Sequence, residues 1–448
     1  MHKLIFWLVP TAALLGALTA YRSLSDPVSL QKQDAAPPQI LTQPLPTSSV
    51  AQVTAVAPIL LATSEPDPEI QAQLQAYLDQ LSQQGFVSTN QGIWVQTHEQ
   101  LLASHQGSTP LPAASLTKVA TSLALLHSFG PGHRFTTEIG VTGPIEAGVV
   151  QGDLVIFGGA DPFFVWEEAM AVANRLQERG IRQINGNLVI AGKFYMNFFT
   201  DPQQAGELLR QGLNAQIWPP EAETQFQSLP SGTPRPQITV QGAVVVATQT
   251  ATDPQPLLRH SSQPLVELIK KMNRYSNNLM ADMLAAEVGG PANVAAQVAE
   301  IIGLPAQEIQ LINGSGLGVE NRLSPRAATA LFIHLAELLQ AQDLTIADAF
   351  EVVGIDDGVL EKRLLPTPLV AKSGTLNQVS SLAGALPTQD QGILWFAIMN
   401  TGADVEGARV QQGQLLKLWV NRWQPVSALP ETLTPTLALT RDSQQEWP

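Results

Sequence analysis

Apolar residues recur every three or four positions in several segments of the chain, and this spacing predicts amphipathic helices. The segment 69–84 follows the pattern and stops at a glycine, which favours a helix end. A second helix is predicted to begin near Leu116 and to stop at a Gly-Pro pair. Two more are predicted, from Glu167 to Arg179 and from Ala408 to Trp423, the last with Val410, Leu415, Leu418 and Trp419 packed inward.

Other segments carry short apolar runs punctuated by glycine, which predict strands. Between residues 139 and 246 these runs include GVVQGDLVIFGGADP and INGNLVIAG. After Pro366 three strand-like runs follow one another, LVAKSGTL, QVSSLAGAL and GILWFAIMNT, as in an antiparallel meander. This order of elements predicts an α/β (α+β) fold, an antiparallel sheet flanked by helices and interrupted by a smaller inserted α+β subdomain.

The N-terminal segment has a different character. Leu4 to Ala20 carry no charge and follow a short basic start, the pattern of a secretory signal peptide. Cleavage after Ala20 would place Leu18 where a small residue is preferred, and the apolar run is at the lower edge of the length that spans a bilayer. A retained membrane anchor, and with it a membrane contact, is therefore open as well.

Composition divides the rest of the chain. A stretch rich in Pro, Gln, Ala, Ser and Thr predicts a flexible linker, and a similar composition marks the C-terminal end. We expect five parts: a signal peptide or anchor (1–25), a linker (26–68), a main domain in two segments (69–138 and 247–423), an inserted subdomain (139–246) and a flexible tail (424–448).

The overall composition excludes several classes of function. The 448 residues are 44% hydrophobic and 14% charged, which suits buried cores and not a disordered chain. The net charge is −14 and no basic run exceeds a pair, so nucleic-acid binding is disfavoured. No cysteine is present, which excludes thiol catalysis and disulfides, and the seven histidines form no H-x-H or H-E-x-x-H pair of a zinc hydrolase.

An S-x-x-K sequence, Ser115 to Lys118, lies at the start of the second predicted helix. Serine and lysine three positions apart share a helix face, and a lysine made neutral by burial or by a second cation can accept a proton from the serine. The alternative is a helix-capping serine beside a solvated lysine. A second S-x-x-K, Ser29 to Lys32, lies in the linker with no predicted helix around it, and we take it as a chance match.

Two further polar groups lie later in the chain. Ser276-Asn277-Asn278 falls in a polar break between two predicted helices, where a helix-capping turn is the alternative interpretation. Lys372-Ser373-Gly374-Thr375 falls within a predicted strand, where an edge lysine beside a glycine bulge is the alternative. The order S-x-x-K, S-x-N and K-[ST]-G on suitable elements makes a joint catalytic role the better interpretation, because this triple marks penicillin-recognising serine enzymes.

The resemblance extends beyond the triple. Several blocks resemble the low-molecular-mass class C penicillin-binding proteins, the D-alanyl-D-alanine carboxypeptidase/endopeptidase family, from about residue 69 to 423. They are LPAASLTKVATSLALLHSFGPGHRFTTEI, VVQGDLVIFGGADP, PLVELIKKMNRYSNNLMADML, INGSGLGVENRLSP, GIDDGVLEKRL and AKSGTLNQVSSLAGAL. The resemblance implies a penicillin-binding transpeptidase-like domain that acts on peptidoglycan stem peptides in the periplasm or cell envelope, with no cofactor and with β-lactam antibiotics as covalent inhibitors.

It also implies roles for individual residues. Ser115 would attack the carbonyl of the penultimate D-alanine while neutral Lys118 takes its proton, and the backbone N–H groups of Ser115 and Thr375 would bind the oxyanion. Ser276 would relay a proton to the leaving amine, and Asn278 would hold Lys118 and the substrate amide.

The strand motif would bind the other end of the substrate. Lys372 would supply positive potential, and Ser373, with Gly374 and Thr375 beside it, would hold the terminal carboxylate. The E-x-x-L-N element that β-lactamases use for fast deacylation is not visible, so we expect penicillin to stay attached. A non-catalytic cell-wall-binding protein on the same scaffold and a β-lactamase or esterase are the alternatives.

One block departs from the family pattern. The usual D-G-S-G-L-S-R is here Asn313 to Val319, which loses the acid and the arginine. Arg322 lies three residues on and would share a face with Val319 if the loop were helical. Arg322 is therefore a candidate substrate-binding residue, and a solvated or structural arginine is the alternative.

Overall fold

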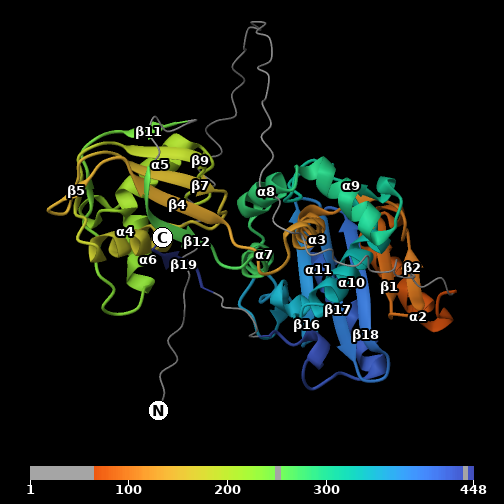
Figure 1. Cartoon of the computed structure of the whole chain (residues 1–448). Helices are drawn as coiled ribbons and strands as arrows, with labels where there is room; N and C mark the ends of the chain where they lie inside the picture. Colours follow the sequence, from red (N-terminus) through yellow and green to blue (C-terminus); the bar gives the residue numbers. More distant parts are fainter. Residues whose placement is uncertain (1–64, 248–253, 437–441, 448) are drawn as a thin grey trace, which may run out of the picture.

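The computed structural model describes residues 65–247, 254–436 and 442–447, which form two bodies (Figure 1). The predicted signal peptide or anchor and nearly all of the predicted linker lie outside these ranges, as do Ser29 and Lys32. Within the described ranges, no helix has the length and apolar character that a membrane crossing requires.

The larger body is built on an antiparallel sheet of six strands in the order β15-β16-β17-β18-β1-β2. The predicted meander is confirmed and supplies the three longest strands. The strands are β1 (Gln91–Gln96), β2 (Leu101–His105), β15 (Glu351–Val353), β16 (Leu369–Leu376), β17 (Val379–Thr388) and β18 (Gly392–Thr401).

Helices cover both faces of this sheet. One face carries α2 (Pro68–Gln83) and α11 (Val405–Trp423). The other carries α3 (Thr117–Phe129), α7 (Leu265–Arg274), α8 (Asn278–Glu287), α9 (Pro291–Ile302) and α10 (Pro325–Gln340). Successive side chains along each strand point to opposite faces of the sheet and pack in two separate hydrophobic cores. Phe396 faces α2 and α11, while Ala397 faces α3 and α10.

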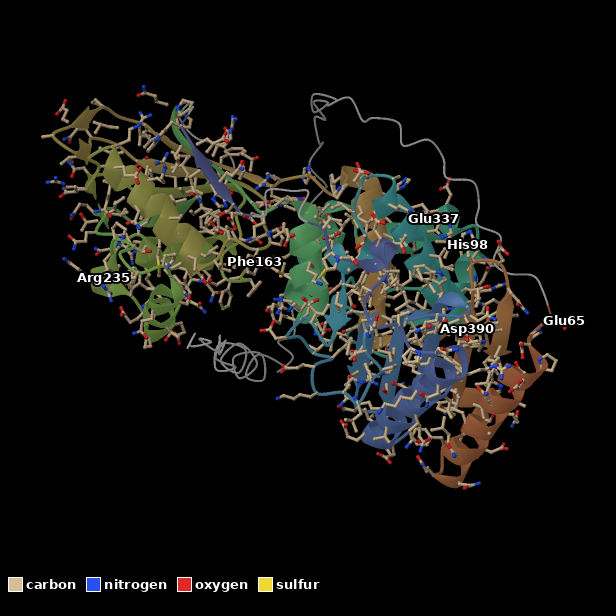
Figure 2. The ribbon with its side chains drawn as sticks, turned by 90° about the horizontal axis from the view of Figure 1, so that it is seen from below. Glu65, His98, Phe163, Arg235, Glu337 and Asp390 are labelled. Atoms are coloured by element: carbon tan, nitrogen blue, oxygen red, sulfur yellow. The ribbon has the colours of Figure 1, made fainter. Side chains whose placement is uncertain are left out.

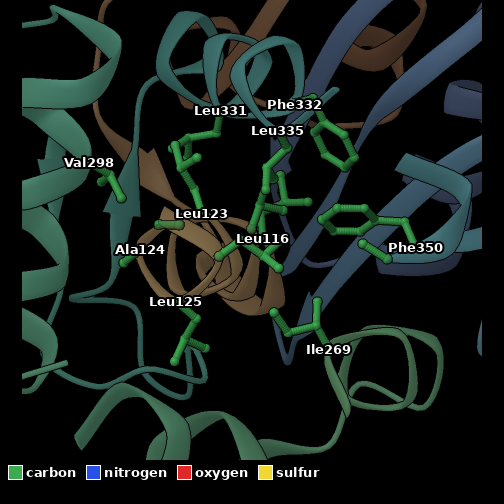
Figure 3. Close-up of a cluster of buried hydrophobic side chains, with 14 of the residues drawn as sticks. Leu116, Leu123, Ala124, Leu125, Ile269, Val298, Leu331, Phe332, Leu335 and Phe350 are labelled. Carbon is green, nitrogen blue, oxygen red and sulfur yellow. The ribbon is translucent and has the colours of Figure 1, made fainter. Parts of the chain in front are cut away.

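Helix α3 is the centre of the second core (Figure 3). Leu116 and Leu123 are fully buried, and Figure 3 shows them between side chains of α7, α9 and α10. Phe332 and Phe350 pack at the side of this cluster with their rings tilted by 46° and the ring centroids 4.7 Å apart. The residue after Ser115 is thus fixed in the core, which holds the start of α3 in place.

Helix α11 differs from its prediction at two positions. Leu415 and Trp419 are buried as expected, but Val410 and Leu418 are exposed. The buried stripe instead passes through Ala408, Gln412 and Leu416. An apolar residue in a helix sequence does not by itself identify the buried face, because the neighbouring sheet and α2 decide which stripe is covered.

In the part of the chain that the structure describes, the smaller body contains two sheets and three α-helices. A six-stranded sheet has the order β11-β9-β7-β4-β12-β19, and a four-stranded sheet has the order β10-β8-β6-β5. Its helices are α4 (Trp166–Glu178), α5 (Pro202–Gly212) and α6 (Pro220–Ser228). Its strands are β4 (Thr136–Val141), β5 (Ile145–Glu146), β6 (Val149–Val150), β7 (Leu154–Gly159), β8 (Gln183–Ile184), β9 (Leu188–Lys193), β10 (Thr239–Val240), β11 (Val244–Val246), β12 (Gln255–Ser261) and β19 (Gln444–Glu446).

The six-stranded sheet of the smaller body extends past residue 246, where the sequence placed the end of the insertion. Strand β12 lies in the segment assigned to the main domain, yet it pairs antiparallel with β4. The sequence of a short strand with mixed polar and apolar residues does not show to which sheet the strand belongs. Its pairing with β4 assigns β12 to the smaller body. We propose that the inserted unit runs from β4 to the end of β12.

The C-terminal end also differs from the predicted flexible tail. Residues Gln444–Glu446 form β19, which pairs antiparallel with the edge of β12. Trp447 packs against the core of the smaller body, and the guanidinium groups of Arg175 and Arg179 lie 5.0 and 4.0 Å from its ring centroid. After α11 the chain still contacts the larger body, where Leu433 lies in its core, and residues 442–447 lie on the smaller body, where Figure 1 marks the C-terminus.

The two bodies meet beside helix α7. Figure 2 labels Phe163 on the smaller body, where it faces this helix, and the Lys271 amine lies 5.2 Å from its ring centroid. Lys193 of β9 pairs with Glu287 of α8 at 3.0 Å. A three-stranded sheet of β13 (Ile309–Gln310), β14 (Arg322–Leu323) and β3 (Leu111–Pro112) completes the larger body.

Trp447→Ala should lower the free energy of unfolding by about 1–2 kcal/mol, because it removes a partly buried ring and two cation–π contacts. Glu446→Ala, at the exposed neighbouring position in β19, is the control and should change stability by no more than about 0.5 kcal/mol. Denaturant unfolding of both variants measures the difference, and equal stability of Trp447→Ala and the wild type would contradict the docked C-terminus.

Candidate active site

Ser115 lies in a tight turn that leads into helix α3. The turn spans Ala114–Leu116, and Ala114 adopts a φ of +48°, a conformation that non-glycine residues rarely adopt. The Ser381 hydroxyl of β17 donates to the Ala113 carbonyl at 2.8 Å. The turn is held by the sheet on one side and by buried Leu116 on the other, which leaves the half-buried Ser115 at the surface of the core.

Lys118 lies one turn further along α3 and its side chain is fully buried. Its amine contacts three oxygens: the Ser115 hydroxyl at 3.0 Å, the Asn278 side-chain carbonyl at 2.7 Å and the Ser315 backbone carbonyl at 2.7 Å. Burial holds the pKa of Lys118 well below its usual value, the positive charge of Lys372 lowers it further, and Asp282 opposes both. The neutral lysine that the sequence analysis required is therefore favoured here.

Ser276 and Asn278 lie in the break between α7 and α8. Ser276 has a φ of +52°, and the Asn277 side chain accepts a hydrogen bond from the Met280 N–H to cap α8. The helix-capping interpretation is thus correct for Asn277. The side chains of Ser276 and Asn278 do not cap the helix and make other contacts. Asn278 contacts Lys118, and the Ser276 hydroxyl lies 3.1 Å from the Lys372 amine.

Lys372 lies on β16 and is almost fully buried, at 1% exposure. Its amine donates to the Ser276 hydroxyl and, at 2.6 Å, to the Ser373 carbonyl. Burial lowers the pKa of Lys372 to about 7, while Glu351 raises it and Arg363 lowers it. Lys118 contacts Ser115, and Lys372 contacts Ser276. Because Lys118 also contacts Asn278, two residues after Ser276, the two serine–lysine pairs lie in one site.

The strand motif passes very close to the serine turn. A Cβ on Gly374 would lie 2.6 Å from the Ala113 carbonyl oxygen and 2.8 Å from the Ser115 nitrogen, so only glycine permits this approach. Ser373 is buried, whereas Thr375 is exposed and its hydroxyl accepts a hydrogen bond from Arg409 at 2.7 Å. Residues 373 to 375 thus form one wall of the site beside Ser115.

The loop Asn313 to Gly318 forms the other wall, and the sequence analysis did not foresee its part. The Ser315 carbonyl accepts from Lys118, and the Asn313 side chain accepts from the Gly316 N–H at 2.7 Å. Gly316 has a φ of +85°, and a Cβ there would overlap the Ala114 carbonyl oxygen. The INGSGLG block marked this loop in the sequence. Its contact with Lys118 could not be predicted from the side chains, because it is made by a backbone carbonyl.

Arg322 is not where a helical loop would have placed it. Residues 319–321 form a turn and Arg322 begins strand β14, opposite Pro112 of β3, so Val319 and Arg322 do not share a helix face. The Arg322 guanidinium donates to the Pro110 carbonyl at 3.4 Å. Among the described residues, no hydrogen bond joins it to Ser115, Lys118 or Lys372. The shared helix face predicted for Val319 and Arg322 is therefore wrong, and the substrate-binding role of Arg322 stays a prediction.

This arrangement suits nucleophilic catalysis. A serine hydroxyl contacts a buried amine that favours its neutral form, and a second hydroxyl contacts a second amine on the opposite wall. Such a pair can pass a proton from an attacking hydroxyl to a leaving group, and the half-open wall at residues 373–375 offers backbone groups to a bound carbonyl.

Comparison with known proteins gives a consistent result. The model of the D-Ala-D-Ala carboxypeptidase 3 (S13) family matches residues 71–219 and 231–421. The chain is 24% identical over 411 residues to the D-alanyl-D-alanine carboxypeptidase DacB of Haemophilus influenzae, covering 70% of this chain and 84% of that protein. It is 24% identical over 417 residues to the carboxypeptidase Rv3627c of Mycobacterium tuberculosis, covering 83% and 85%.

Solved structures show the same fold. The penicillin G-acylated Bd3459 predatory endopeptidase of Bdellovibrio bacteriovorus, in complex with an immunity protein, is similar with a TM-score of 0.67 and 21% identity over 78% of this chain and 97% of that one. Penicillin-binding protein 4 of Haemophilus influenzae in complex with a β-lactam is similar with a TM-score of 0.58 and 20% identity, over 77% and 99%. The predicted penicillin-binding type of fold, with its inserted second unit, is thereby confirmed.

Gly316→Ala should displace the serine turn, because the added methyl group overlaps the Ala114 carbonyl and the backbone has a positive φ. We expect modification of Ser115 by a serine-directed acylating reagent, followed by mass spectrometry, to slow by about a hundredfold. Gly232→Ala is the matched control, since Gly232 also has a positive φ (+93°) but open space around it, and should leave the rate unchanged. Equal rates in the two variants would show that the Gly316 contact does not position Ser115.

Proposed function

This chain belongs to the D-Ala-D-Ala carboxypeptidase 3 (S13) family, and on that premise we propose that it is a serine-type D-alanyl-D-alanine carboxypeptidase/endopeptidase whose nucleophile is Ser115. Its substrates are peptidoglycan stem peptides. The observation that carries the assignment is the hydrogen bond between the buried Lys118 amine and the Ser115 hydroxyl.

Acylation begins when the Ser115 oxygen attacks the carbonyl carbon of the penultimate D-alanine. The hydroxyl proton passes to the Lys118 amine, which the low pKa of the buried lysine makes available as a base. The backbone N–H groups of Ser115 and Thr375 bind the negative oxygen that forms. The close approach of Gly374 to the Ser115 nitrogen supports this role.

The tetrahedral intermediate then loses its amine. The proton held by Lys118 is returned through the Ser276 hydroxyl to the leaving nitrogen, and the carbon–nitrogen bond breaks. Asn278 holds Lys118 from the other side, at 2.7 Å, so that its amine stays directed at the serines. Water afterwards attacks the ester on Ser115, and Lys118 again takes the proton.

The positive wall of the site binds the end of the substrate. Lys372 supplies a buried cation, and the Ser373 hydroxyl with the adjoining Gly374–Thr375 backbone lies where a terminal carboxylate is held. A charge-assisted hydrogen bond of this kind contributes roughly 1.5–3 kcal/mol. A β-lactam presents a carboxylate beside a strained amide, and it acylates the same serine as a covalent inhibitor.

The substrate places the enzyme at the cell wall. We propose that residues 1–25 direct its export to the periplasm or cell envelope, as a cleaved signal peptide or as a membrane anchor. The net charge of −14 gives no attraction for nucleic acid or for an anionic lipid surface, so any membrane contact rests with this N-terminal segment.

Labelling with a fluorescent penicillin, followed over time on a gel, separates the possible activities. A lasting label indicates a penicillin-binding carboxypeptidase, and we expect this outcome. A transient label would indicate a β-lactamase or esterase, and no label would indicate a non-catalytic cell-wall-binding protein.

Ser115→Ala should abolish covalent labelling by penicillin, because it removes the attacking oxygen. Ser29→Ala is the control from the second S-x-x-K and should label as the wild type does. Intact-protein mass spectrometry detects the penicilloyl adduct. An adduct on any serine other than Ser115 would contradict the assignment of Ser115 as the nucleophile.

Lys118→Ala should slow acylation by about 10² to 10⁴, the usual contribution of a general base. Stopped reactions with fluorescent penicillin give the rate constant. Acylation near the wild-type rate would show that another group takes the Ser115 proton.

A further inference from the structure

An arginine of helix α11 contacts the strand motif of the proposed active site, and the mechanism above does not use it. The Arg409 guanidinium donates a hydrogen bond to the Thr375 hydroxyl at 2.7 Å, and 34 residues separate the two in sequence. The contact lies on the wall to which we assign the carboxylate of the substrate. A cation bonded to that wall is therefore a candidate for reading the substrate.

Thr375 lies where a bound peptide can reach it. Strand β15 pairs with residues 369–371 of β16, so the strand motif extends past the end of β15. Side chains alternate along a strand, and Thr375 therefore shares a side of β16 with Ser373, the residue proposed to hold the carboxylate. Ala371, on the same side, lies in the core beneath α11, so this side of the strand faces α11. Thr375 itself is exposed.

The hydrogen bond sets the direction of the Thr375 hydroxyl. A threonine hydroxyl has one proton to donate and lone pairs that accept, whereas arginine can only donate. Because the Thr375 oxygen accepts from Arg409, its own proton is directed to another acceptor. An ionised carboxylate only accepts, so the hydroxyl is oriented to donate to a substrate carboxylate beside Ser373.

Helix α11 is held firmly against this part of the sheet. Gln412, one turn after Arg409, is fully buried and donates to the Ser380 carbonyl at 3.1 Å and to the Asn400 side chain at 2.7 Å. The strand register places Ser380 directly opposite Thr375. Two residues on one face of α11 thus contact both members of one cross-strand pair, which fixes the start of the Arg409 side chain.

The positive charge of Arg409 is only weakly offset. Its ion-pair partner is Glu406, whose side chain is 77% exposed, and water screens a pair of this kind strongly. Arg363 lies nearby, since burial and the charge of Arg409 lower the pKa of Arg363 to about 10. Two guanidinium groups beside one exposed carboxylate leave positive charge at this end of the wall, which suits an anionic group of the substrate.

The two cations of the wall differ in what they can touch. Lys372 is 1% exposed, and its amine already donates to the Ser276 hydroxyl and to the Ser373 carbonyl. The Arg409 side chain is 27% exposed. Lys372 therefore acts through its potential, while Arg409 is available for contact.

We propose that Arg409 is a specificity-determining residue, which selects substrates with a free C-terminal carboxylate by orienting the Thr375 hydroxyl toward that group and by supplying a positive charge that the substrate can reach. The inference rests on the proposed function and assigns part of its substrate selection to helix α11. It predicts discrimination against peptides whose C-terminal end is uncharged.

The test compares two acetylated peptides that end in D-Ala-D-Ala, one with a free C-terminal carboxylate and one with a C-terminal amide. Release of D-alanine or of its amide gives kcat/KM for each. In Arg409→Gln the carboxylate peptide should lose about tenfold in kcat/KM, the low end for a charge-assisted hydrogen bond, while the amide peptide stays nearly unchanged. The loss should appear mainly in KM, because the contact is already made in the bound substrate.

Arg422→Gln is the matched control. Arg422 lies on the same helix, has a side chain exposed to a similar degree (30% against 27%) and also pairs with a glutamate, Glu69. Each substitution removes one positive charge, yet Arg422 lies about 20 Å further along the helix. We expect Arg422→Gln to keep the wild-type preference for the carboxylate peptide.

Two further variants define how Arg409 acts. Arg409→Lys keeps the charge but loses the planar fork of donors, so it should recover part of the preference. Combining Arg409→Gln with Thr375→Val should lower kcat/KM by less than the product of the two separate losses, because the two side chains act as one unit. Losses that multiply would contradict the orientation of Thr375 by Arg409.

The outcomes separate two failures. A wild-type enzyme that hydrolyses both peptides equally, or an Arg409→Gln enzyme that loses activity equally on both or on neither, would overturn this inference alone. A wild-type protein that hydrolyses neither peptide and is not acylated by penicillin would overturn the proposed function, and the inference with it. Should Arg409→Gln fail to fold, Arg409→Lys replaces it, and a smaller loss confined to the carboxylate peptide is expected; an unchanged preference would again contradict the proposal.

Discussion

The proposed active site depends on the burial of one amine, that of Lys118. Removing an ammonium group from water is costly, and three oxygens from three separate elements surround this one. The turn before α3 brings Ser115, the start of α8 brings Asn278, and the loop after β13 brings the Ser315 carbonyl. The same burial that requires these partners also favours the neutral form of the lysine. Packing and chemistry are therefore set by the same contacts.

The sheet provides the fixed frame for this arrangement. Strands β16 and β17 hold the serine turn from one side, through the Gly374 approach and the Ser381 hydrogen bond. The core around α3 holds it from the other side, with Leu116 fully buried. A turn with a non-glycine residue at positive φ persists only where its surroundings determine it, and here two rigid layers do so.

The smaller body is attached to the same frame in two ways. Its Phe163 and Lys193 contact α7 and α8, the two helices between which Ser276 lies. The C-terminal strand β19 then connects it to the end of the chain, which has already crossed the larger body in α11. The smaller body thus contacts both helices that flank the α7–α8 break, and the break itself is part of the catalytic site that we propose.

The sequence by itself determined the local features of this protein. The spacing of apolar residues predicted the helices near 69–84 and after Leu116 and the three-stranded meander, and the order of S-x-x-K, S-x-N and K-S-G indicated one serine-based site. These patterns depend on neighbours a few residues apart, and they are therefore readable without the fold. The tertiary structure decided the rest. It assigned β12 and β19 to the smaller body, placed Arg322 in a strand, buried Leu416 of α11 in place of Leu418, and brought the Ser315 carbonyl to Lys118. These features depend on strand pairing, on packing and on backbone atoms of residues distant in sequence, which leave no periodic mark in the chain.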